Sequence, residues 1–138
     1  MRLTRVYRFS ASHRLHASRL TAGANAELYG KCNNPHGHGH DYVLHISVAG
    51  GLDERTGRIV DPGALDRYVA DRVLHPFDHK DMNADVGDFH DQVPTTENLT
   101  LAIQRRLLPD WRKHFGTLRL DRVFIEETPR NKFELRSA

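Results

Sequence analysis

Residues 38–49 limit the possible folds of this chain more than any other segment. In an extended strand, side chains two residues apart lie on the same face, because successive side chains point to opposite sides. The residues that would share one face are His38, His40, Tyr42, Leu44, Ile46 and Val48. Because such an apolar stripe needs cover, the segment is expected to be a strand in a sheet with one buried face.

Three further segments alternate as strands do. They span residues 3–13, 118–127 and 131–136. The residues expected on one face of the first of these strands are Tyr7, Phe9, Ala11 and His13. In two of the four expected strands, histidines therefore share one face with apolar residues.

Two helices are expected between the early and the late strands. Asp61-Pro62 predicts a helix start, because a carboxylate caps the first turn and proline fits the first helical position. His75-Pro76 is expected to end that helix. Residues 94–97, Pro-Thr-Thr-Glu, predict the start of the second. The residues with helical spacing are Leu65, Tyr68, Val69, Arg72 and Val73, then Leu99, Ile103, Leu107 and Trp111.

The order strand, strand, helix, helix, strand, strand predicts an α+β domain. We expect a four-stranded antiparallel sheet with both helices on one face. Residues 16–37 are expected to be a long loop, residues 53–57 a turn, and residues 76–94 polar and irregular. The second face and the edges of such an open sheet need cover, so an oligomer is expected.

Composition narrows the class of protein. A chain of 138 residues with 28% charged residues suggests one globular domain. A net charge of +2 with scattered basic residues argues against a nucleic-acid partner. No apolar run approaches a membrane span, and the N-terminus lacks the apolar core of a signal peptide. The single cysteine fits a reducing compartment, so a cytoplasmic protein is expected.

Three histidines have the spacing of a catalytic zinc site. His38 and His40 would present two imidazoles on one strand face, and His13 is the third candidate ligand. Three imidazoles and one open position are typical of catalytic zinc, which prefers tetrahedral nitrogen and sulfur ligands. The alternative is a glycine-rich turn with solvated histidines. His36 also fits the alternation, but it follows a proline and is interpreted as a bystander.

Cys32, the only thiol, lies close to this histidine cluster in the sequence. A nearby metal or positive charge would lower its pKa and make it a base or nucleophile. The alternatives are a small buried residue or a fourth zinc ligand, which would close the site. Asp78-His79 is a second candidate, because an aspartate can orient an imidazolium in a proton relay with the thiol.

Two further groups are candidates for ligand contacts. Thr95, Thr96 and Glu97 are a helix cap by sequence, yet they also offer hydroxyls and backbone N–H groups. Glu126 and Glu127 end a predicted strand. Either carboxylate would accept the paired N–H donors of a guanidine-like ring edge, and the sequence leaves open which one does.

Several motifs together resemble the 6-pyruvoyl-tetrahydropterin synthase family, which also includes the bacterial 6-carboxytetrahydropterin synthases of queuosine biosynthesis. The segments that carry the resemblance are Phe9-Ser-Ala-Ser-His13-Arg-Leu, Gly30-Lys-Cys32-Asn-Asn-Pro, His38-Gly-His40, Asp53 to Gly57, Asp78-His79-Lys80, Thr95-Thr96-Glu97-Asn98 and Glu127-Thr128. Five residues separate Cys32 from His38, as in the pyruvoyl, animal-type branch, whereas the queuosine enzymes have a shorter gap. Folate-pathway variants carry glutamate in place of Cys32.

The resemblance implies a single T-fold domain over residues 1–138. In this family trimers close a barrel, two trimers stack into a hexamer, and active sites lie at subunit interfaces. The residues matched to family roles are His13, His38 and His40 as zinc ligands, Cys32 as catalytic thiol, Asp78 and His79 as a relay pair from a neighbouring subunit, Glu127 as pterin anchor, and Thr95, Thr96 and Glu97 as pocket lining. Two departures are His36, where the animal enzymes have asparagine, and the tail after Thr128.

The implied reaction converts 7,8-dihydroneopterin triphosphate to 6-pyruvoyl-tetrahydropterin with loss of triphosphate, a carbon–oxygen lyase step acting on a phosphate. Arg14, Arg19 and Lys31 are candidates to receive the triphosphate. One alternative is the same scaffold making 6-carboxytetrahydropterin with release of acetaldehyde. The other is a zinc-stabilised binding module without catalysis, which chelation would unfold.

Overall fold

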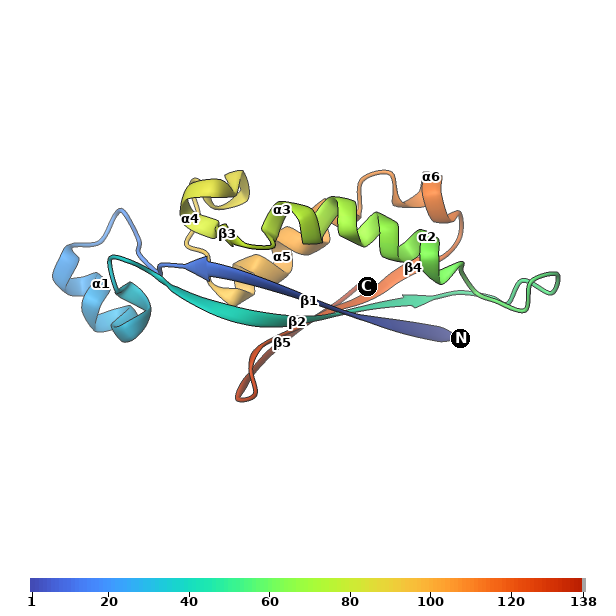
Figure 1. Ribbon diagram of the computed structural model, residues 1–138, viewed down its shortest axis with the longest axis horizontal. Coiled ribbons are helices and arrows are strands. Elements are labelled where there is room, and N and C mark those ends of the chain that lie inside the picture. Colours follow the sequence, from blue (N-terminus) through green and yellow to red (C-terminus); the bar gives the residue numbers. More distant parts are fainter. Residues whose placement is uncertain (138) are drawn as a thin grey trace.

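One mixed sheet of five strands is the framework of the computed structural model, which describes residues 1–137 (Figure 1). The strands are β1 (Arg2–His13), β2 (His38–Ala49), β3 (Lys80–Asp81), β4 (Arg119–Thr128) and β5 (Asn131–Arg136), and their spatial order is β3-β1-β2-β4-β5. The four long strands pair antiparallel, as expected. The register places His13 opposite His38 and Ala11 opposite His40.

The expected four-stranded, purely antiparallel sheet is wrong in one respect. The short strand β3 adds to the edge of β1 in parallel orientation, with Ala11 opposite Lys80. Just before it, the His79 amide donates to the Ser10 carbonyl at 2.6 Å. Two residues are too few to show an alternating pattern, so this strand is set by tertiary pairing. The closed oligomeric barrel stays a prediction.

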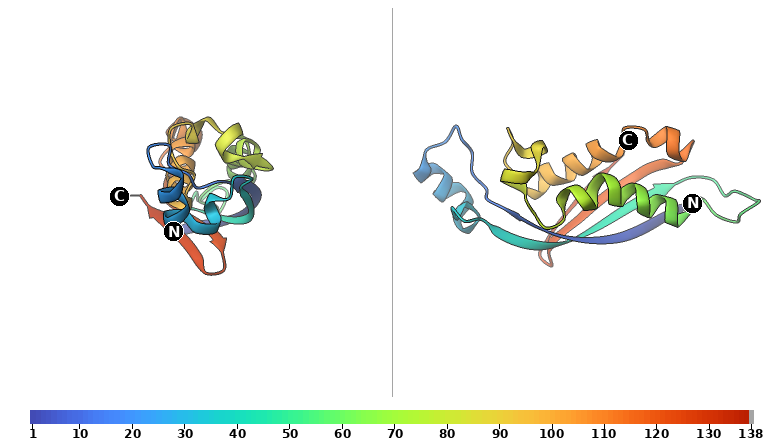
Figure 2. Two further views of the ribbon diagram at one scale, coloured as in Figure 1. Left: turned by 90° about the vertical axis from the view of Figure 1, so that its left-hand side faces the viewer. Right: turned by 45° about the horizontal axis from the view of Figure 1, so that its top comes forward.

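The helices lie on one face of the sheet, as Figures 1 and 2 show from three directions. They are α1 (Ala22–Tyr29), α2 (Pro62–Val69), α3 (His75–Phe77), α4 (Met82–Asp85), α5 (Thr96–Leu107) and α6 (Trp111–Phe115). Helix α1 differs from the rest because it stands beyond the end of the long strands (Figure 1). None of the helices within residues 1–137 is long and apolar enough to cross a bilayer.

Two sequence-based boundaries are corrected. The expected loop at 16–37 contains α1, followed by a 3-10 turn over Gly30–Asn33. The helix that begins at Pro62 does not end at His75-Pro76, but continues through a π turn, Ala70–Leu74, to Phe77. There the His75 amide donates to the Ala70 carbonyl, five residues back. This widened turn gives room for the ring of Pro76, which an ordinary α-turn would crowd.

The core lies between the sheet and helices α2 and α5. Leu44 and Ile46 of β2 are fully buried, as are Leu65 of α2 and Ile103 of α5. Burying each such side chain stabilises the fold by about 1.5–3 kcal/mol. The apolar positions expected from helical spacing are therefore confirmed, and Trp111 is buried as well. This packing holds β2 rigidly, which matters because β2 begins with two histidines.

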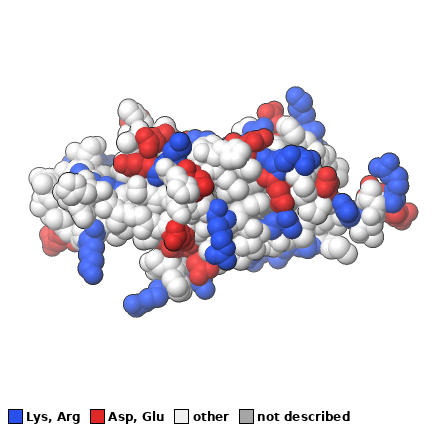
Figure 3. All heavy atoms as spheres, viewed as in Figure 1, with Lys and Arg blue, Asp and Glu red and all other residues white. Residues whose placement is uncertain are grey.

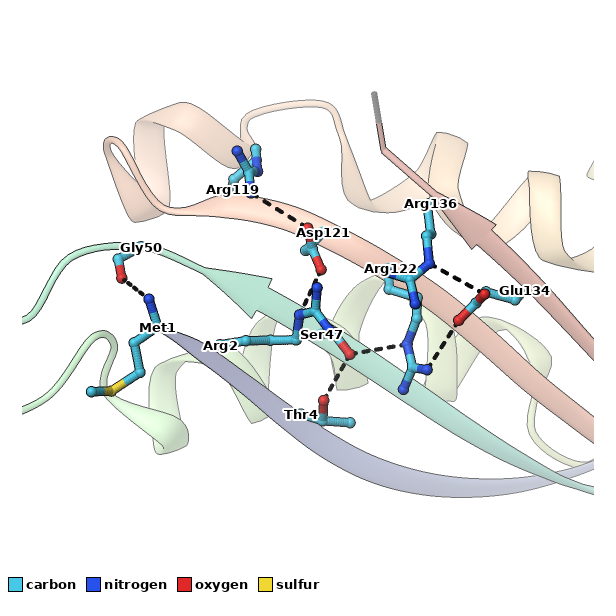
Figure 4. Close-up of polar contacts among 10 residues, drawn as sticks. All are labelled: Met1, Arg2, Thr4, Ser47, Gly50, Arg119, Asp121, Arg122, Glu134 and Arg136. Carbon is cyan, nitrogen blue, oxygen red and sulfur yellow. Dashed lines mark hydrogen bonds and ion pairs between the residues drawn. The ribbon is translucent and has the colours of Figure 1, made fainter.

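A polar network fastens the opposite end of the sheet, on the face away from the helices (Figure 4). Ser47 is fully buried and contacts the Thr4 hydroxyl at 2.7 Å, and it accepts from Arg122 Nε at 3.3 Å. Arg122 also pairs with Glu134 at 3.0 Å, which joins β4 to β5.

Elsewhere on the surface, Figure 3 shows basic and acidic side chains interspersed over the face in view, in keeping with the scattered charges of the sequence.

Candidate metal centre and active site

Three histidines meet where β1 ends and β2 begins. His13, His38 and His40 each offer one ligand atom, and these atoms lie within 4.8 Å of one another. Their ring centroids are 4.9, 5.0 and 4.7 Å apart. The alternation of β2 puts two of the rings on one face, and antiparallel pairing with β1 brings the third across from them. The structure thus gathers the three candidate ligands predicted from the sequence.

Gly37 allows this approach. It has φ of 70°, and a Cβ on it would lie 3.1 Å from the His13 carbonyl oxygen. Only glycine adopts that conformation without strain, so it turns the chain into β2 directly beside the end of β1. The turn also directs His36 elsewhere: it is exposed and lies outside the three-histidine group.

The ring nitrogens that face each other lack hydrogen-bond partners. In the part of the chain described, His13 Nε2, His38 Nδ1 and His40 Nε2 are buried without one. Glu127 Oε1 lies 3.1 Å from His40 Nε2, but outside hydrogen-bond geometry. Buried polar atoms are nearly always satisfied, so three convergent unpaired nitrogens fit a metal ion. The residues present are therefore a suitable ligand set.

The backbone orients one of these rings. His13 Nδ1 lies 2.9 Å from the Pro94 carbonyl oxygen, which can only accept a hydrogen bond. The ring proton is therefore on Nδ1, and the lone pair of Nε2 is directed at the cluster. Burial, with the neighbouring imidazoles, lowers the pKa of His13 to about 4. Burial likewise lowers the pKa of His40. Both rings are neutral near pH 7, the form that binds metals.

Cys32 lies in the 3-10 turn that follows α1 and is partly buried. Its sulfur is not in the three-histidine group, so the arrangement keeps three ligands rather than a closed four-ligand site. Burial, and then the negative charge of Glu127, raise the pKa of the Cys32 thiol. The expected lowering of this pKa requires a nearby metal or positive charge and stays a prediction, since within the chain burial and Glu127 act in the opposite direction.

Glu127, at the end of β4, points to the same side as the histidines. Its Oε2 accepts from the Thr96 hydroxyl at 2.5 Å, which joins β4 to the first turn of α5. Glu126 lies on the other face, where its charge acts on His45. Strand alternation therefore resolves the ambiguity between the two glutamates in favour of Glu127 as the one beside the cluster.

Within one chain, Thr95 and Glu97 of the Thr-Thr-Glu segment stabilise the start of α5. Thr95 is the N-cap of α5, and its hydroxyl accepts from the Asn98 amide at 3.2 Å. Glu97 is exposed in the first turn, where a carboxylate interacts favourably with the helix dipole. Thr96 is buried and joins the site through its hydrogen bond to Glu127.

Asp78 and His79 pair with each other but stand apart from the cluster. Asp78 Oδ1 accepts from the Ser10 amide at 2.9 Å and lies 3.0 Å from His79 Nδ1. The Ser10 amide first, and His79 second, lower the pKa of Asp78. The His79 side chain is 83% exposed, and no hydrogen bond or ion pair among residues 1–137 links it to the three histidines. One chain alone therefore does not assemble the full candidate set.

Several site features were not predicted from the sequence. Tyr42, expected only as a core residue, is fully buried and its hydroxyl has no partner among the described residues. The Pro94 carbonyl is a backbone group, for which a sequence carries no signal. Among the basic candidates, Arg14 donates from Nε to the Asn33 carbonyl at 3.1 Å. Arg19 lines a cavity of about 800 Å³ with His16 and His90.

Comparisons of sequence and structure with known proteins agree with the family resemblance of the motifs. The family model described as 6-pyruvoyl tetrahydropterin synthase matches residues 2–138. A 6-pyruvoyl tetrahydrobiopterin synthase of Poecilia reticulata is 46% identical over 101 residues, which cover 73% of this chain and 69% of that protein. The Drosophila melanogaster protein of that name is 40% identical over 129 residues, covering 94% and 75%. The solved Caenorhabditis elegans 6-pyruvoyl tetrahydropterin synthase superposes with a TM-score of 0.89 at 35% identity, over 100% of this chain and 96% of that one.

Proposed function

Because the chain belongs to the 6-pyruvoyl tetrahydropterin synthase family, we propose that it converts 7,8-dihydroneopterin triphosphate to 6-pyruvoyl-tetrahydropterin with loss of triphosphate. In this proposal it is a carbon–oxygen lyase acting on a phosphate. The observation that carries it is the cluster of three imidazoles whose ligand atoms lie within 4.8 Å of one another, in a fold shared with a solved member of the family. Animal-type relatives favour the pyruvoyl product over the carboxy product.

The metal in this proposal is zinc, held by His13, His38 and His40. When bound with an open position, zinc acts as a Lewis acid that acidifies hydroxyl groups of the substrate side chain. The protein's own part is to hold the three rings in place and to keep His13 and His40 neutral. Burial keeps His13 unprotonated, and the Pro94 carbonyl directs its free lone pair toward the cluster.

Cys32 is the proposed base. As a thiolate, its Sγ takes a carbon-bound proton from the substrate side chain. Because burial and Glu127 raise the pKa of the thiol, the positive charge of a loaded site would favour the thiolate.

His79 is the proposed proton carrier between the substrate side chain and the pterin ring, with Asp78 stabilising its charged form. The chemistry is an internal redox shift: elimination removes the triphosphate, the side-chain carbons are oxidised, and the ring is reduced. The electrons stay within the substrate, so no nicotinamide is required. The Asp78–His79 pair is exposed and separate from the cluster, so we assign it to the active site of a neighbouring subunit.

Glu127 is the proposed anchor for the pterin ring. A carboxylate accepts two parallel N–H bonds from a guanidine-like edge, as it does from an arginine. Thr96 already holds one of its oxygens and so orients the group. An assembly of trimers, two of them forming a hexamer, would bring this anchor and the relay pair together at subunit interfaces.

Metal removal and restoration test the proposal. The protein is treated with a chelator, then reloaded with zinc, and triphosphate release and circular dichroism are followed throughout. We expect the chelated protein to keep its helical signal and lose turnover, and zinc to restore turnover. Unfolding on chelation would indicate a zinc-stabilised binding module instead. Turnover that survives complete metal removal would contradict a metal-dependent reaction.

A further inference from the structure

Four hydrogen bonds fasten the turn that carries the thiol to the segment just after β1. The Leu15 amide donates to the Cys32 carbonyl at 2.7 Å, and Arg14 Nε donates to the Asn33 carbonyl at 3.1 Å. The other two come from one side chain: Asn33 Nδ2 lies 2.8 Å from the Leu15 carbonyl oxygen and 2.9 Å from His16 Nδ1. Asn33 is buried, with 9% of its surface exposed.

The chemistry of these partners fixes the direction of each bond. The Leu15 carbonyl can only accept, so the amide nitrogen of Asn33, and not its oxygen, must face it. That nitrogen has two protons, and the second points to His16 Nδ1. His16 therefore accepts through a lone pair on Nδ1 and carries its ring proton on Nε2. The amide of Asn33 thus uses both of its donors to join the Cys32 turn to Leu15 and His16. These two contacts are called the junction below.

The segment that Asn33 contacts, which follows β1, is itself held by hydrogen bonds. Arg14 follows a candidate metal ligand, and its amide donates to Asn83 Oδ1 at 2.7 Å. In return Asn83 Nδ2 donates to the Arg14 carbonyl at 2.9 Å. The backbone from His13 to Leu15 is therefore held in place. The junction through Asn33 then sets where the Cys32 turn lies relative to the histidine cluster.

We propose that Asn33 is the positioning residue for the Cys32 thiol, holding the turn Cys32–Asn33 against Leu15 and His16. The inference rests on the proposed function, in which that thiol takes a carbon-bound proton from the substrate. Proton transfer requires the reacting atoms within hydrogen-bond reach, so a small displacement of the thiol lowers the rate without removing any reacting group. Asn33 itself does not contact the substrate in this proposal.

The test compares two variants of Asn33 with a matched control. Asn33→Ala removes both donors. Asn33→Asp keeps the size of the side chain but cannot donate to the Leu15 carbonyl, and it covers the case in which the alanine variant does not fold. The control is Asn34→Ala, because Asn34 is exposed and its Oδ1 accepts only within its own turn, from the His36 amide at 3.1 Å.

Two readouts are measured on zinc-loaded protein well below its melting temperature. The first is the pH profile of Cys32 alkylation by iodoacetamide, which is unambiguous because the chain has one cysteine. Releasing the turn exposes the thiol but moves it away from the positive charge of the loaded site, so both Asn33 variants should alkylate several-fold faster at high pH, with a midpoint at higher pH. The second is turnover: kcat should fall by about 10- to 100-fold while KM changes by less than about twofold. Asn34→Ala should match the wild type in both.

The alternatives are separated by these readouts. A purely structural role for Asn33 would lower the melting temperature but leave the native alkylation profile and kcat unchanged, which would overturn the proposal. Equal changes in Asn34→Ala would also overturn it, because the effect would not be specific to the junction. If the wild type shows no turnover, the proposed function fails, yet the alkylation profile still decides whether Asn33 positions the thiol.

Discussion

His13 Nδ1 lies 2.9 Å from the carbonyl oxygen of Pro94, so a backbone group just before α5 sets the orientation of an imidazole at the end of β1. This contact fixes the ring proton on Nδ1 and leaves Nε2, which has no other partner in the described residues, facing His38 and His40. The fold itself therefore brings the three rings together. Its consequences can be tested one residue at a time.

Replacing His38 by alanine should abolish metal binding. Without His38 the site loses one of its three nitrogen ligands, so bound zinc should fall from about one ion per chain to a small fraction of that after dialysis. Metal analysis of the purified protein measures this. His36→Ala is the control, because His36 is exposed and lies outside the cluster, and it should retain full zinc. Full occupancy in the His38 variant would refute the ligand assignment.

Replacing Cys32 by alanine should remove turnover while keeping the fold and the metal. The sulfur is outside the histidine group, so zinc content should match the wild type. Loss of a positioned general base typically costs about 10²- to 10⁴-fold in rate. Turnover is measured as triphosphate release under saturating substrate. Unchanged turnover would remove the thiol from the mechanism.

The two adjacent glutamates should behave differently. Glu127→Gln keeps the shape of the side chain but loses the charge that would hold the pterin edge, so KM should rise by about 10- to 100-fold, as for a lost charge-assisted hydrogen bond. Glu126→Gln is the control, since Glu126 faces the opposite side of the sheet. Similar KM values for the two variants would show that the anchor is placed wrongly.

The metal-free protein should lose stability as the pH falls. The unfolded chain binds a proton at His13 near pH 6.5, whereas burial lowers its pKa in the folded state to about 4. Between these values the unfolded state carries the extra proton, so the free energy of unfolding decreases as the pH falls and levels off below about pH 4. His13 alone would contribute about 3 kcal/mol.

Urea unfolding of chelated protein across this pH range measures that effect. A His13→Gln variant should have a flatter dependence on pH, because it lacks the titrating ring. If the wild type and this variant showed the same slope, the ring would not be held neutral by the fold.

The sequence was sufficient to predict the long strands and the histidine cluster. Both follow from period-two alternation over many residues, as in β2, and the structure confirms the boundaries of that strand at His38 and Ala49. The short strand Lys80–Asp81 was missed because two residues carry no periodicity. Helix α1 was missed because it lacks an apolar stripe; Thr21 caps it, and the buried side chain of Asn25 holds it to Ala17.

The remaining site features depend on relationships that no local pattern encodes. Whether Glu126 or Glu127 faces the cluster depends on whether the alternation of β4 continues to the end of the strand, where the pairing with β5 is irregular. The upward pKa shift of Cys32 depends on burial and on Glu127, which is distant in sequence. The structure pairs Asp78 with His79, but their role in the site of a neighbouring subunit stays a prediction.

The most direct test of the proposed function is to identify the product. Zinc-loaded protein is incubated with 7,8-dihydroneopterin triphosphate, and the pterin and phosphate products are identified by mass spectrometry, with Cys32→Ala as the inactive control. We expect 6-pyruvoyl-tetrahydropterin together with released triphosphate. A 6-carboxy product with acetaldehyde, or no conversion by protein with zinc bound, would contradict it.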